Sequence, residues 1–481
     1  SRTEKEGLSF LTITLPNFCR DFERSLSRGR IDSTDFRSFR KSGAIPAFLQ
    51  GMLSQLFSRE TGDILDETPD SSVLVEGVRQ ICLLFKKVLV PCSPERVSAA
   101  LESFIQIERD NELFAVPEKQ LDNFTSVSRV LWDSVLGDIR LDMLLPRHGP
   151  GATAERISGN QKYVWRRWHE RLEPYFPFLG SGYSISACEK GLDDSEGEDD
   201  LLSATTFVPE QEEDPVRVVF VPKTLKSPRT IAIEPVCMQY AQQAIQSFLY
   251  ERLESHPLTR GQVNFTDQTV NQRLALDSSR TGRYATIDLS DASDRVLHTL
   301  AMEMFRGTPD LSGAIEACRS RSALLPTGDI LSPLFKFASM GSALCFPVEA
   351  MVFYTICIVA RLAYHNLPVS YASVKLVCKD IYVYGDDIIV PTDEAEAVLD
   401  HLQYFHCKVN SSKTFYTGKF RESCGLDAYA GKEVTPTYLR RMRPENRQQA
   451  SELISWIATA NLLYLKGYWR AAELMFSTCE Q

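Results

Sequence analysis

The sequence predicts a folded α+β protein of several domains. Its 481 residues exceed the roughly 100–200 residues of a single domain and can bury a large core. Hydrophobic residues (43%), charged residues (24%) and aromatic residues (10%) occur at ordinary globular levels, which excludes a disordered chain, collagen or a coiled coil. Helical patterns fill the first part of the chain, and strand patterns flanked by charged residues follow in the second part.

Charge and cysteine content limit the classes of function. The formal net charge is −10, so the basic residues that bind phosphates must be gathered locally if the chain binds nucleic acid. Twelve cysteines are scattered from Cys19 to Cys479 without a CxxC pair, as expected of reduced, buried thiols and not of a disulfide framework or a zinc site. The most apolar stretch, Ala350 to Ala360, is too short to cross a bilayer. We therefore expect a cytoplasmic protein that does not bind a membrane.

The first 146 residues have helical periodicity but no motif that carries chemistry. Apolar residues recur every three or four positions from Val73 to Leu89, as in an amphipathic helix. The next stretch, Arg147 to Arg171, is basic and interleaved with Tyr163, Trp165 and Trp168. Such a mixture can follow and stack on a single nucleic-acid strand, and a solvated helix with both tryptophans in the core explains it equally well.

Two acidic runs precede a segment of opposite charge. Residues 189–200 hold seven acids and residues 210–214 hold four, and because like charges repel we expect a mobile surface loop there. From Pro215 to Ile233 there is no acid, and the basic residues are Arg217, Lys223, Lys226 and Arg229. Two strand-like runs interrupted by prolines predict a basic hairpin or loop, suited to holding triphosphate oxygens. A surface hairpin with solvated charges is the alternative.

Asp288 lies near the end of a predicted strand, Tyr284 to Leu289, and the polar residues that follow can begin a helix. Ligands and catalytic groups favour the carboxyl ends of strands in open α/β sheets, although a single Asp at such a place is more often a helix cap. Asp294 follows six positions later, in the expected first helical turn.

A second group of carboxylates lies between two β-rich runs in Ile381 to Val390. Gly385 permits the positive φ of a type II′ turn, so a hairpin would present Asp386 and Asp387 at its tip. Two unit charges about 4 Å apart repel by about 4 kcal/mol at an effective dielectric constant of about 20, so carboxylates that converge with Asp288 need a cation. Mg²⁺ prefers hard oxygen ligands, and two such ions can align an attacking hydroxyl with a leaving pyrophosphate. A solvated hairpin tip is the alternative.

Between these strands, small residues lead into a long apolar helix within Leu325 to Tyr364. Ser339, Gly341 and Ser342 would let a backbone approach a substrate closely, and a flexible interhelix loop is an equally good interpretation. Further on, Lys413 lies near a predicted strand and could donate a proton to departing pyrophosphate. An ordinary surface lysine is the simpler interpretation.

Taken in order, these segments resemble the successive motifs of a viral RNA-dependent RNA polymerase. Five segments of the sequence, two of them not described above, together resemble the catalytic β-subunit of the replicase of leviviruses, the single-stranded RNA bacteriophages. They are FTDQTVNQRLA (Phe265 to Ala275), IDLSDASD, FASMGSALCFPVEAMVF, VYGDDIIV and FRESCGLDAYAGKEVTPTYLR (Phe420 to Arg440). The resemblance runs from about Gly149 to Arg440, and five motifs in one order make coincidence negligible.

The resemblance implies a right-hand polymerase fold, with palm, fingers and thumb around a template channel and an antiparallel palm sheet flanked by helices. The implied regions are 1–146, a helical part of the fingers or an interaction surface; 147–283, fingers with the basic segment; 284–425, palm with a finger insertion near 303–336; and 426–481, a short thumb.

The resemblance also implies roles for single residues. Asp288, Asp386 and Asp387 match the catalytic carboxylates that bind two Mg²⁺ ions, with Mn²⁺ as a substitute. Asp294 matches the residue near the incoming ribose, and Lys413 matches the general acid. The implied nucleotide contacts are Arg217, Lys223, Lys226, Arg229, Asp294, Ser339, Gly341 and Ser342.

The implied activity is RNA-directed synthesis of RNA from NTPs, which replicates a phage single-stranded RNA genome in the cytoplasm of a bacterial host. RNA template, RNA product and host translation proteins such as elongation factors Tu and Ts are the implied partners. Cys345 and Glu349 stand where viral polymerases often carry Thr and Asn, which leaves ribose selection to Asp294 and Ser342.

Two other functions compete with this one. A reverse transcriptase shares the palm but places a bulky aromatic residue near the ribose, where Asp294 stands. A non-catalytic RNA-binding or assembly protein on a polymerase fold is opposed by the presence of all three carboxylates.

Overall fold

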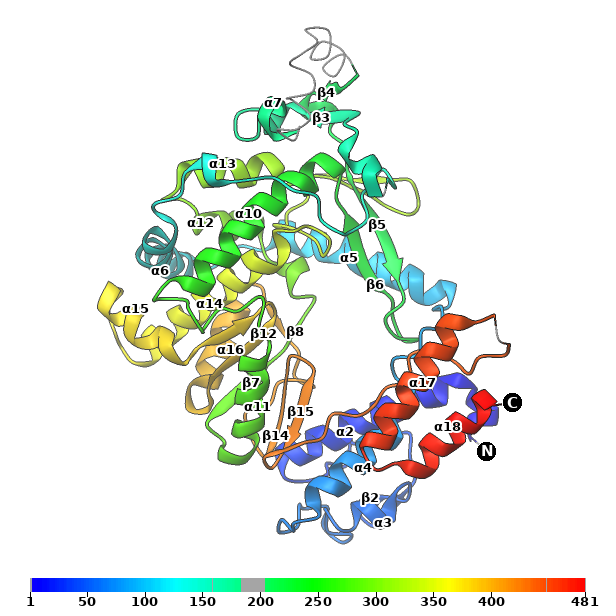
Figure 1. Ribbon diagram of the computed structural model, residues 1–481. Helices are drawn as coiled ribbons and strands as arrows, with labels where there is room; N and C mark the ends of the chain where they lie inside the picture. The colour runs from blue at the N-terminus through cyan, green and yellow to red at the C-terminus, as the bar shows by residue number, and fades with distance from the viewer. Residues whose placement is uncertain (1, 158, 183–203, 447, 481) are drawn as a thin grey trace.

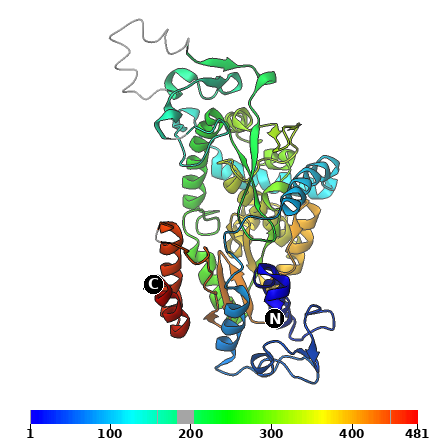
Figure 2. The same ribbon diagram turned by 90° about the vertical axis from the view of Figure 1, so that its right-hand side faces the viewer.

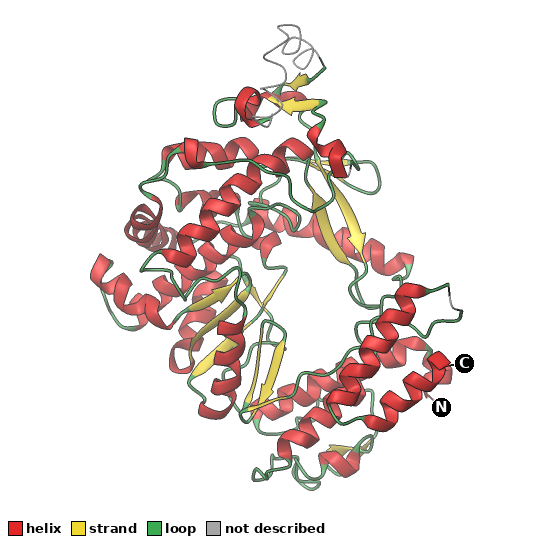
Figure 3. Ribbon diagram, in the orientation of Figure 1, coloured by secondary structure: helices red, strands yellow, loops and turns green. Residues whose placement is uncertain are grey.

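The computed structural model describes residues 2–157, 159–182, 204–446 and 448–480. Helices and short strands are mixed throughout this part of the chain (Figure 3), in agreement with the predicted α+β class. The acidic run 189–200 lies outside the described residues.

The helices before residue 147 are α1 (Arg2–Glu6), α2 (Leu15–Arg28), α3 (Gln50–Leu53), α4 (Ser71–Leu83), α5 (Pro94–Leu113) and α6 (Glu118–Leu136). Those that follow are α7 (Phe178–Ser181), α10 (Val236–Ser255), α11 (Thr269–Thr281), α12 (His298–Glu303), α13 (Pro309–Cys318), α14 (Cys345–Tyr364), α15 (Tyr371–Val377), α16 (Ala395–Tyr404), α17 (Ala450–Leu465) and α18 (Trp469–Glu480).

Three antiparallel strands form the sheet that carries the acidic residues, in the order β11 (Tyr382–Tyr384), β12 (Asp387–Pro391) and β7 (Tyr284–Ile287). Ile388 pairs with Ile287, so positions 387 and 288 lie opposite each other where β7 ends. Two short strands, β8 (Leu289–Ser290) and β13 (Lys408–Val409), continue the pairing beyond that point. Helices α11 and α14 pack against the sheet, and α16 packs on α14 (Figure 1).

Helix α14 lies at the centre of the largest hydrophobic core. Its residues are buried along almost the whole length because the helix is apolar on every face. The helix is longer than its most apolar stretch, and its length and composition would suit a membrane span, but it is almost entirely covered by the rest of the protein, as a core helix is. Trp132 of α6 donates its indole N–H to Thr355 Oγ1 at 3.0 Å, which joins the N-terminal region to this core.

The predicted basic hairpin is present as β5 (Val216–Val221) and β6 (Arg229–Ile233), which pair antiparallel. With β9 (Ala323–Leu324) and β10 (Ile330–Leu331) they form a four-stranded sheet in the order β10-β9-β5-β6. Phe104 of α5 packs with Val216, Val218 and Ala232 in a small core of its own, so α5 covers the hairpin.

The N-terminal helices also cover the C-terminal strands β14 (Phe420–Ser423), β15 (Leu426–Tyr429) and β16 (Lys432–Glu433). Helix α4 confirms the predicted periodicity, although it ends at Leu83, and its apolar face meets α2 and Phe420. Short strands β1 (Lys41–Ser42) and β2 (Ile45–Pro46) complete this part. Figure 1 draws the chain termini close together, and Figure 2 shows that α18 lies well to one side of the N-terminal helices.

The basic and aromatic stretch from Arg147 to Arg171 is not the helix considered above. It contains a short strand, β3 (Arg167–His169), parallel to β4 (Thr206–Val208), while Trp165 and Trp168 are buried as that alternative expected. The second acidic run lies at the surface as predicted, with residues 210–212 exposed in a short 3₁₀ helix. Its last two acids are ion-paired, because Arg171 contacts Glu213 at 2.6 Å and Arg167 contacts Asp214 at 2.7 Å.

Candidate active site

The hairpin between β11 and β12 has the tight turn that the sequence predicts. Gly385 has a φ of 61°, and a Cβ there would lie 2.0 Å from the Phe346 ring, so both conformation and space require glycine. Tyr384 pairs with Asp387 across the turn. Asp386 is therefore in the turn, Asp387 begins β12 and Asp288 follows β7, which brings all three carboxylates to one edge of the sheet.

Asp387 is held by the loop after β14. The Cys424 backbone N–H and the Ser423 hydroxyl donate to its Oδ1 at 3.1 Å and 3.3 Å. Burial, followed by the neighbouring charge of Asp386, raises the pKa of Asp387 to about 7. The carboxyl group is thus fixed in place in surroundings that make its ionised form less favourable than in water.

Asp288 has a partly compensated environment. Asn410 donates to its Oδ2 at 2.8 Å, and Lys413 Nζ lies 3.6 Å from its Oδ1. Burial raises the pKa of Asp288 to about 6, and the positive charge of Lys413 opposes that rise. Within the described residues, no group of three or more His, Cys, Asp and Glu side chains is already arranged to hold a metal ion.

Lys413 lies between two acids. Its ammonium group is 3.5 Å from Glu422 Oε1 and 3.6 Å from Asp288. The charge of Glu422 raises the pKa of Lys413 above its usual value, and Asp288 adds to the effect. Lys413 therefore keeps its proton and is not the free surface lysine that its position in the sequence allowed.

A cavity of about 610 Å³ lies between the sheet edge and the basic hairpin. The predicted site residues in its wall are Lys223, Arg229, Asp294, Gly341, Ser342 and Asp386. Burial and the charge of Arg229 lower the pKa of Lys223, while Asp288 and Asp386 act in the opposite direction. Lys223 and Asp386 therefore lie in the wall of one cavity, whereas Asp288 and Asp387 are not among its wall residues.

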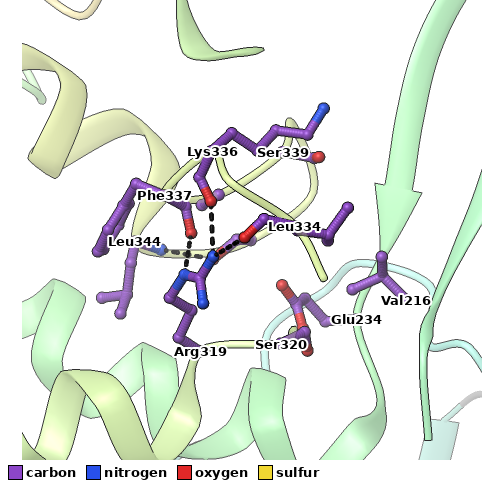
Figure 4. A pocket seen from close by; sticks show the side chains of 11 residues that line it. Val216, Glu234, Arg319, Ser320, Leu334, Lys336, Phe337, Ser339 and Leu344 are labelled. Atoms are coloured by element: carbon purple, nitrogen blue, oxygen red, sulfur yellow. Dashed lines mark hydrogen bonds between the residues drawn. The ribbon is translucent and has the colours of Figure 1, made fainter. Parts of the chain in front are cut away.

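Other predicted nucleotide contacts lie elsewhere. Arg217 donates its Nε–H to the Ala154 carbonyl oxygen at 3.1 Å, away from the cavity wall. Lys226 is not among the residues of the cavity wall, and burial, followed by the charges of Arg20 and Lys86, lowers its pKa. Ser339 lines a separate cavity of about 10 Å³ (Figure 4), where its hydroxyl has no partner among the described residues.

The small residues of the loop before α14 serve the hairpin as well as the cavity. Gly341 has a φ of 131°, and a Cβ there would lie 2.1 Å from the Ala232 carbonyl oxygen. Ala232 of β6 donates its backbone N–H to the Met340 carbonyl oxygen at 2.9 Å, and Ser342 donates to Gln242 Oε1 at 3.0 Å. Gly341 is therefore required because the loop backbone lies directly against strand β6, whether or not a substrate also approaches it.

Sequence reasoning missed several residues of this site. Helix α5 contributes to the cavity wall through Ala100, Ser103, Phe104 and Ile107, and Lys336 contacts Asp294 at 2.8 Å. A lone lysine within the apolar run LFKF was a usable signal for a buried charge. Nothing in the pattern of α5 indicated its contact with residues almost 200 positions later.

The comparisons with known proteins are decisive on family. The family model described as RNA replicase, beta-chain, matches residues 205–450. The chain belongs to the RNA replicase beta-chain family. The predicted resemblance to the levivirus replicase subunit is thereby confirmed, and residues 205–450 of this replicase-family chain include all three aspartates.

The replicase-family match extends to individual phage proteins. The chain is 36% identical over 224 residues to the RNA-directed RNA polymerase beta chain of Enterobacteria phage fr, covering 47% of this chain and 37% of that protein. It is 35% identical over 224 residues to the beta chain of Escherichia phage MS2, with the same coverage. The Escherichia virus Qbeta polymerase subunit beta is 36% identical over 224 residues, covering 47% and 35%. The matched stretch thus spans little more than a third of these relatives.

Two solved structures are also similar in part. One is the RNA-dependent RNA polymerase of a human picorbirnavirus, with a TM-score of 0.38, 13% identity and coverage of 55% of each chain. The other is the BmCPV RNA-dependent RNA polymerase at elongation state, with a TM-score of 0.42, 10% identity and coverage of 70% of this chain and 31% of that chain.

Proposed function

We propose that this chain is an RNA-directed RNA polymerase that replicates a phage single-stranded RNA genome from NTPs. One observation carries the proposal: three carboxylates meet at a sheet edge, opposite a basic hairpin, in a chain of the replicase family. The names that the relatives carry support it.

We assign the parts of a right hand to this chain on the same basis. The palm is residues 284–425, with its antiparallel sheet β11-β12-β7 and a finger insertion near 303–336. Fingers are residues 147–283 with the basic hairpin, and residues 426–481 form a short thumb. Of the helical region 1–146, α5 packs on the fingers hairpin, while α2 and α4 cover the C-terminal strands and could serve as an interaction surface.

The residues at the sheet edge suit a divalent cation. Hard oxygen donors are supplied by Asp288, Asp386 and Asp387. Among the described contacts, Lys413 is the one cationic group paired with these carboxylates. The three side chains would hold Mg²⁺, with Mn²⁺ as a substitute. A bound cation supplies positive charge that activates a hydroxyl and neutralises phosphate oxygens. Two of the carboxylates are oriented by hydrogen bonds: Asp288 accepts one from Asn410, and Asp387 accepts from Ser423 and Cys424.

The cavity wall supplies the nucleotide contacts. Lys223 and Arg229 are placed to bind the triphosphate, and Asp294 and Ser342 to contact the ribose, beside the close backbone approach at Gly341. Arg217 and Lys226 are further proposed triphosphate contacts on the same hairpin, although they lie outside the cavity wall, and Arg217 also donates to the Ala154 carbonyl oxygen. The Ser339 backbone carbonyl oxygen accepts the Ser342 N–H at 3.1 Å, which supports the loop that carries Gly341, and its hydroxyl remains a proposed nucleotide contact.

In the reaction, the 3′-hydroxyl of the growing RNA attacks the α-phosphate of the NTP and pyrophosphate leaves. The chain contributes mainly by positioning the reactants and by neutralising charge. Lys413 retains a proton between Glu422 and Asp288, and we assign to it the transfer of that proton to the leaving pyrophosphate.

The partners follow from this activity. RNA template, RNA product and NTPs are the direct ones, in the cytoplasm of the bacterial host. Host translation proteins such as elongation factors Tu and Ts are further proposed partners.

Primer extension tests the proposal. The protein is incubated with a pre-annealed RNA primer and template, Mg²⁺ and either NTPs or dNTPs, beside Asp386→Asn. We expect extension with NTPs that the variant loses. Extension with dNTPs instead would identify a reverse transcriptase, and intact RNA binding without synthesis, unrestored by bacterial lysate, would favour the non-catalytic alternative.

A further inference from the structure

Lys336 is a fully buried lysine next to the proposed nucleotide site. Its side chain is 0% exposed, and its Nζ lies 2.8 Å from Asp294 Oδ1 and 3.4 Å from Glu108 Oε1. The Phe104 ring covers the ammonium group, with 3.7 Å from Nζ to the ring centroid. A lysine is almost never buried in this way unless it is paired, and Asp294 is the nearer of its two acidic partners.

The backbone around Lys336 is also fixed. Arg319 donates from Nη2 to the carbonyl oxygens of Leu334 and Lys336, both at 2.7 Å, and from Nε to Phe337 at 2.9 Å (Figure 4). The Lys336 side chain points away from Arg319 in this view. Glu108 Oε2 accepts the Phe335 backbone N–H at 2.7 Å. The loop therefore directs the ammonium group to one place.

Asp294 is held from two sides as a result. Lys336 binds its Oδ1, and Asn111 of α5 donates to its backbone carbonyl oxygen at 2.9 Å. Among the described residues its Oδ2 has no hydrogen-bond partner, and the side chain is 21% exposed in the wall of the large cavity. One carboxylate oxygen is thus anchored and the other is available to a ligand.

We propose that Lys336 is a positioning residue that fixes the Asp294 carboxylate so that its second oxygen accepts a hydrogen bond from the 2′-hydroxyl of the incoming nucleotide. The inference rests on the proposed polymerase function. It adds the residues that fix the sugar-contacting Asp294: Lys336 from the loop of residues 334–337 and Asn111 from helix α5. A fixed acceptor rejects a nucleotide without the hydroxyl because its own hydrogen bond is then lost in a partly buried place. A carboxylate free to turn toward water loses that selectivity.

The test compares two variants that each remove one charge from the same buried cluster. Lys336→Met removes the contact with Asp294 and keeps the length of the side chain, while Glu108→Gln leaves that contact in place. The readout is kcat/KM for an NTP divided by that for the matching dNTP in primer extension. We expect Lys336→Met to lower this ratio about tenfold, mostly through KM for the NTP, and Glu108→Gln to keep it within about twofold of the wild type.

A double variant shows whether Lys336 acts through Asp294. In an Asp294→Ala background, Lys336→Met should leave the ratio unchanged, since the group that it positions is gone. Asn111→Ala gives a second single variant with no change of charge, for use if Lys336→Met does not fold, and it should lower the ratio about threefold.

The outcomes separate the two proposals. No extension by the wild type would overturn the polymerase function itself. Extension by the wild type with an unchanged ratio in Lys336→Met or, if that variant does not fold, in Asn111→Ala would overturn the positioning role alone. An equal fall in the ratio for Lys336→Met and Glu108→Gln would also overturn the positioning role, because it would show that the loss of any charge from this buried cluster has the same effect.

Discussion

Asp387→Asn should make the cation-free protein more stable while it removes the response to Mg²⁺. Burial and Asp386 raise the Asp387 pKa from its usual 3.8 to about 7, which corresponds to about 4 kcal/mol against the ionised form. Asparagine carries no charge and can still accept from the Cys424 backbone N–H, so this cost disappears in the variant.

The sign of the pH dependence follows from the raised pKa. Below about pH 4 the carboxyl is neutral in both the folded and the unfolded chain, and no cost exists. Between about pH 4 and 7 the unfolded chain loses the proton first, so the wild type loses stability as pH rises, until the cost levels off above 7. The advantage of Asp387→Asn should therefore be about 4 kcal/mol at pH 8 and about 2 kcal/mol at pH 5.

Thermal unfolding in EDTA and in Mg²⁺ measures both effects. In EDTA at pH 8, Asp387→Asn should melt several degrees above the wild type, and Mg²⁺ should raise the wild-type midpoint by binding the folded state but leave the variant almost unchanged. Asp393→Asn, an exposed carboxylate just beyond β12, is the matched control and should behave as the wild type does. A variant that is less stable than the wild type in EDTA at pH 8 would refute the reasoning.

Three further predictions concern other parts of the site. Burial raises the pKa of Glu234 from its usual 4.5 to about 7, although hydrogen bonds such as that from Ser320 at 2.5 Å oppose the rise. The free energy of unfolding should therefore fall by about 3 kcal/mol between pH 4.5 and 7. Glu234→Gln should remove most of this pH dependence in urea titrations, and a variant with the pH dependence of the wild type would contradict the prediction. Lys413→Leu should lower kcat about 100-fold with little change in KM, because the step needs a proton donor at that place. Lys413→Arg keeps the charge but does not release a proton, so it should be nearly as slow as Lys413→Leu, and a wild-type rate of single-nucleotide addition in Lys413→Arg would show that Lys413 transfers no proton. Gly341→Ala should destabilise the fold by about 2 kcal/mol or more and weaken NTP binding, because its Cβ would collide with the Ala232 carbonyl oxygen; a wild-type midpoint in urea would exclude the collision.

Local patterns predicted the elements that carry the carboxylates. The turn at Gly385 and the strand before Asp288 each depend on residues within ten positions of one another, and the basic hairpin is contained in residues 216–233. The convergence of positions 288 and 387, which lie opposite each other where β7 ends, was implied by the resemblance to the replicase family and not by local pattern.

Contacts distant in sequence could not be predicted in this way. Asn111 meets Asp294 and Glu108 meets Lys336 only after the chain has folded, and helical periodicity says which face is buried but not what covers it. Charge alone also did not indicate that the Arg217 guanidinium donates to the Ala154 carbonyl oxygen. The second acidic run shows the same limit, since Arg171 neutralises Glu213 from 42 positions away.

The central claim is that Asp288, Asp386 and Asp387 together hold the cations of a nucleotidyl transfer site. Anomalous diffraction from crystals soaked in Mn²⁺ with RNA and an unreactive NTP analogue tests it most directly. We expect two manganese peaks among the three carboxylates, roughly 3.5–4 Å apart, with the analogue's phosphates between them and Lys223. Manganese bound elsewhere, or an analogue bound in the cavity without any peak at these aspartates, would contradict the account.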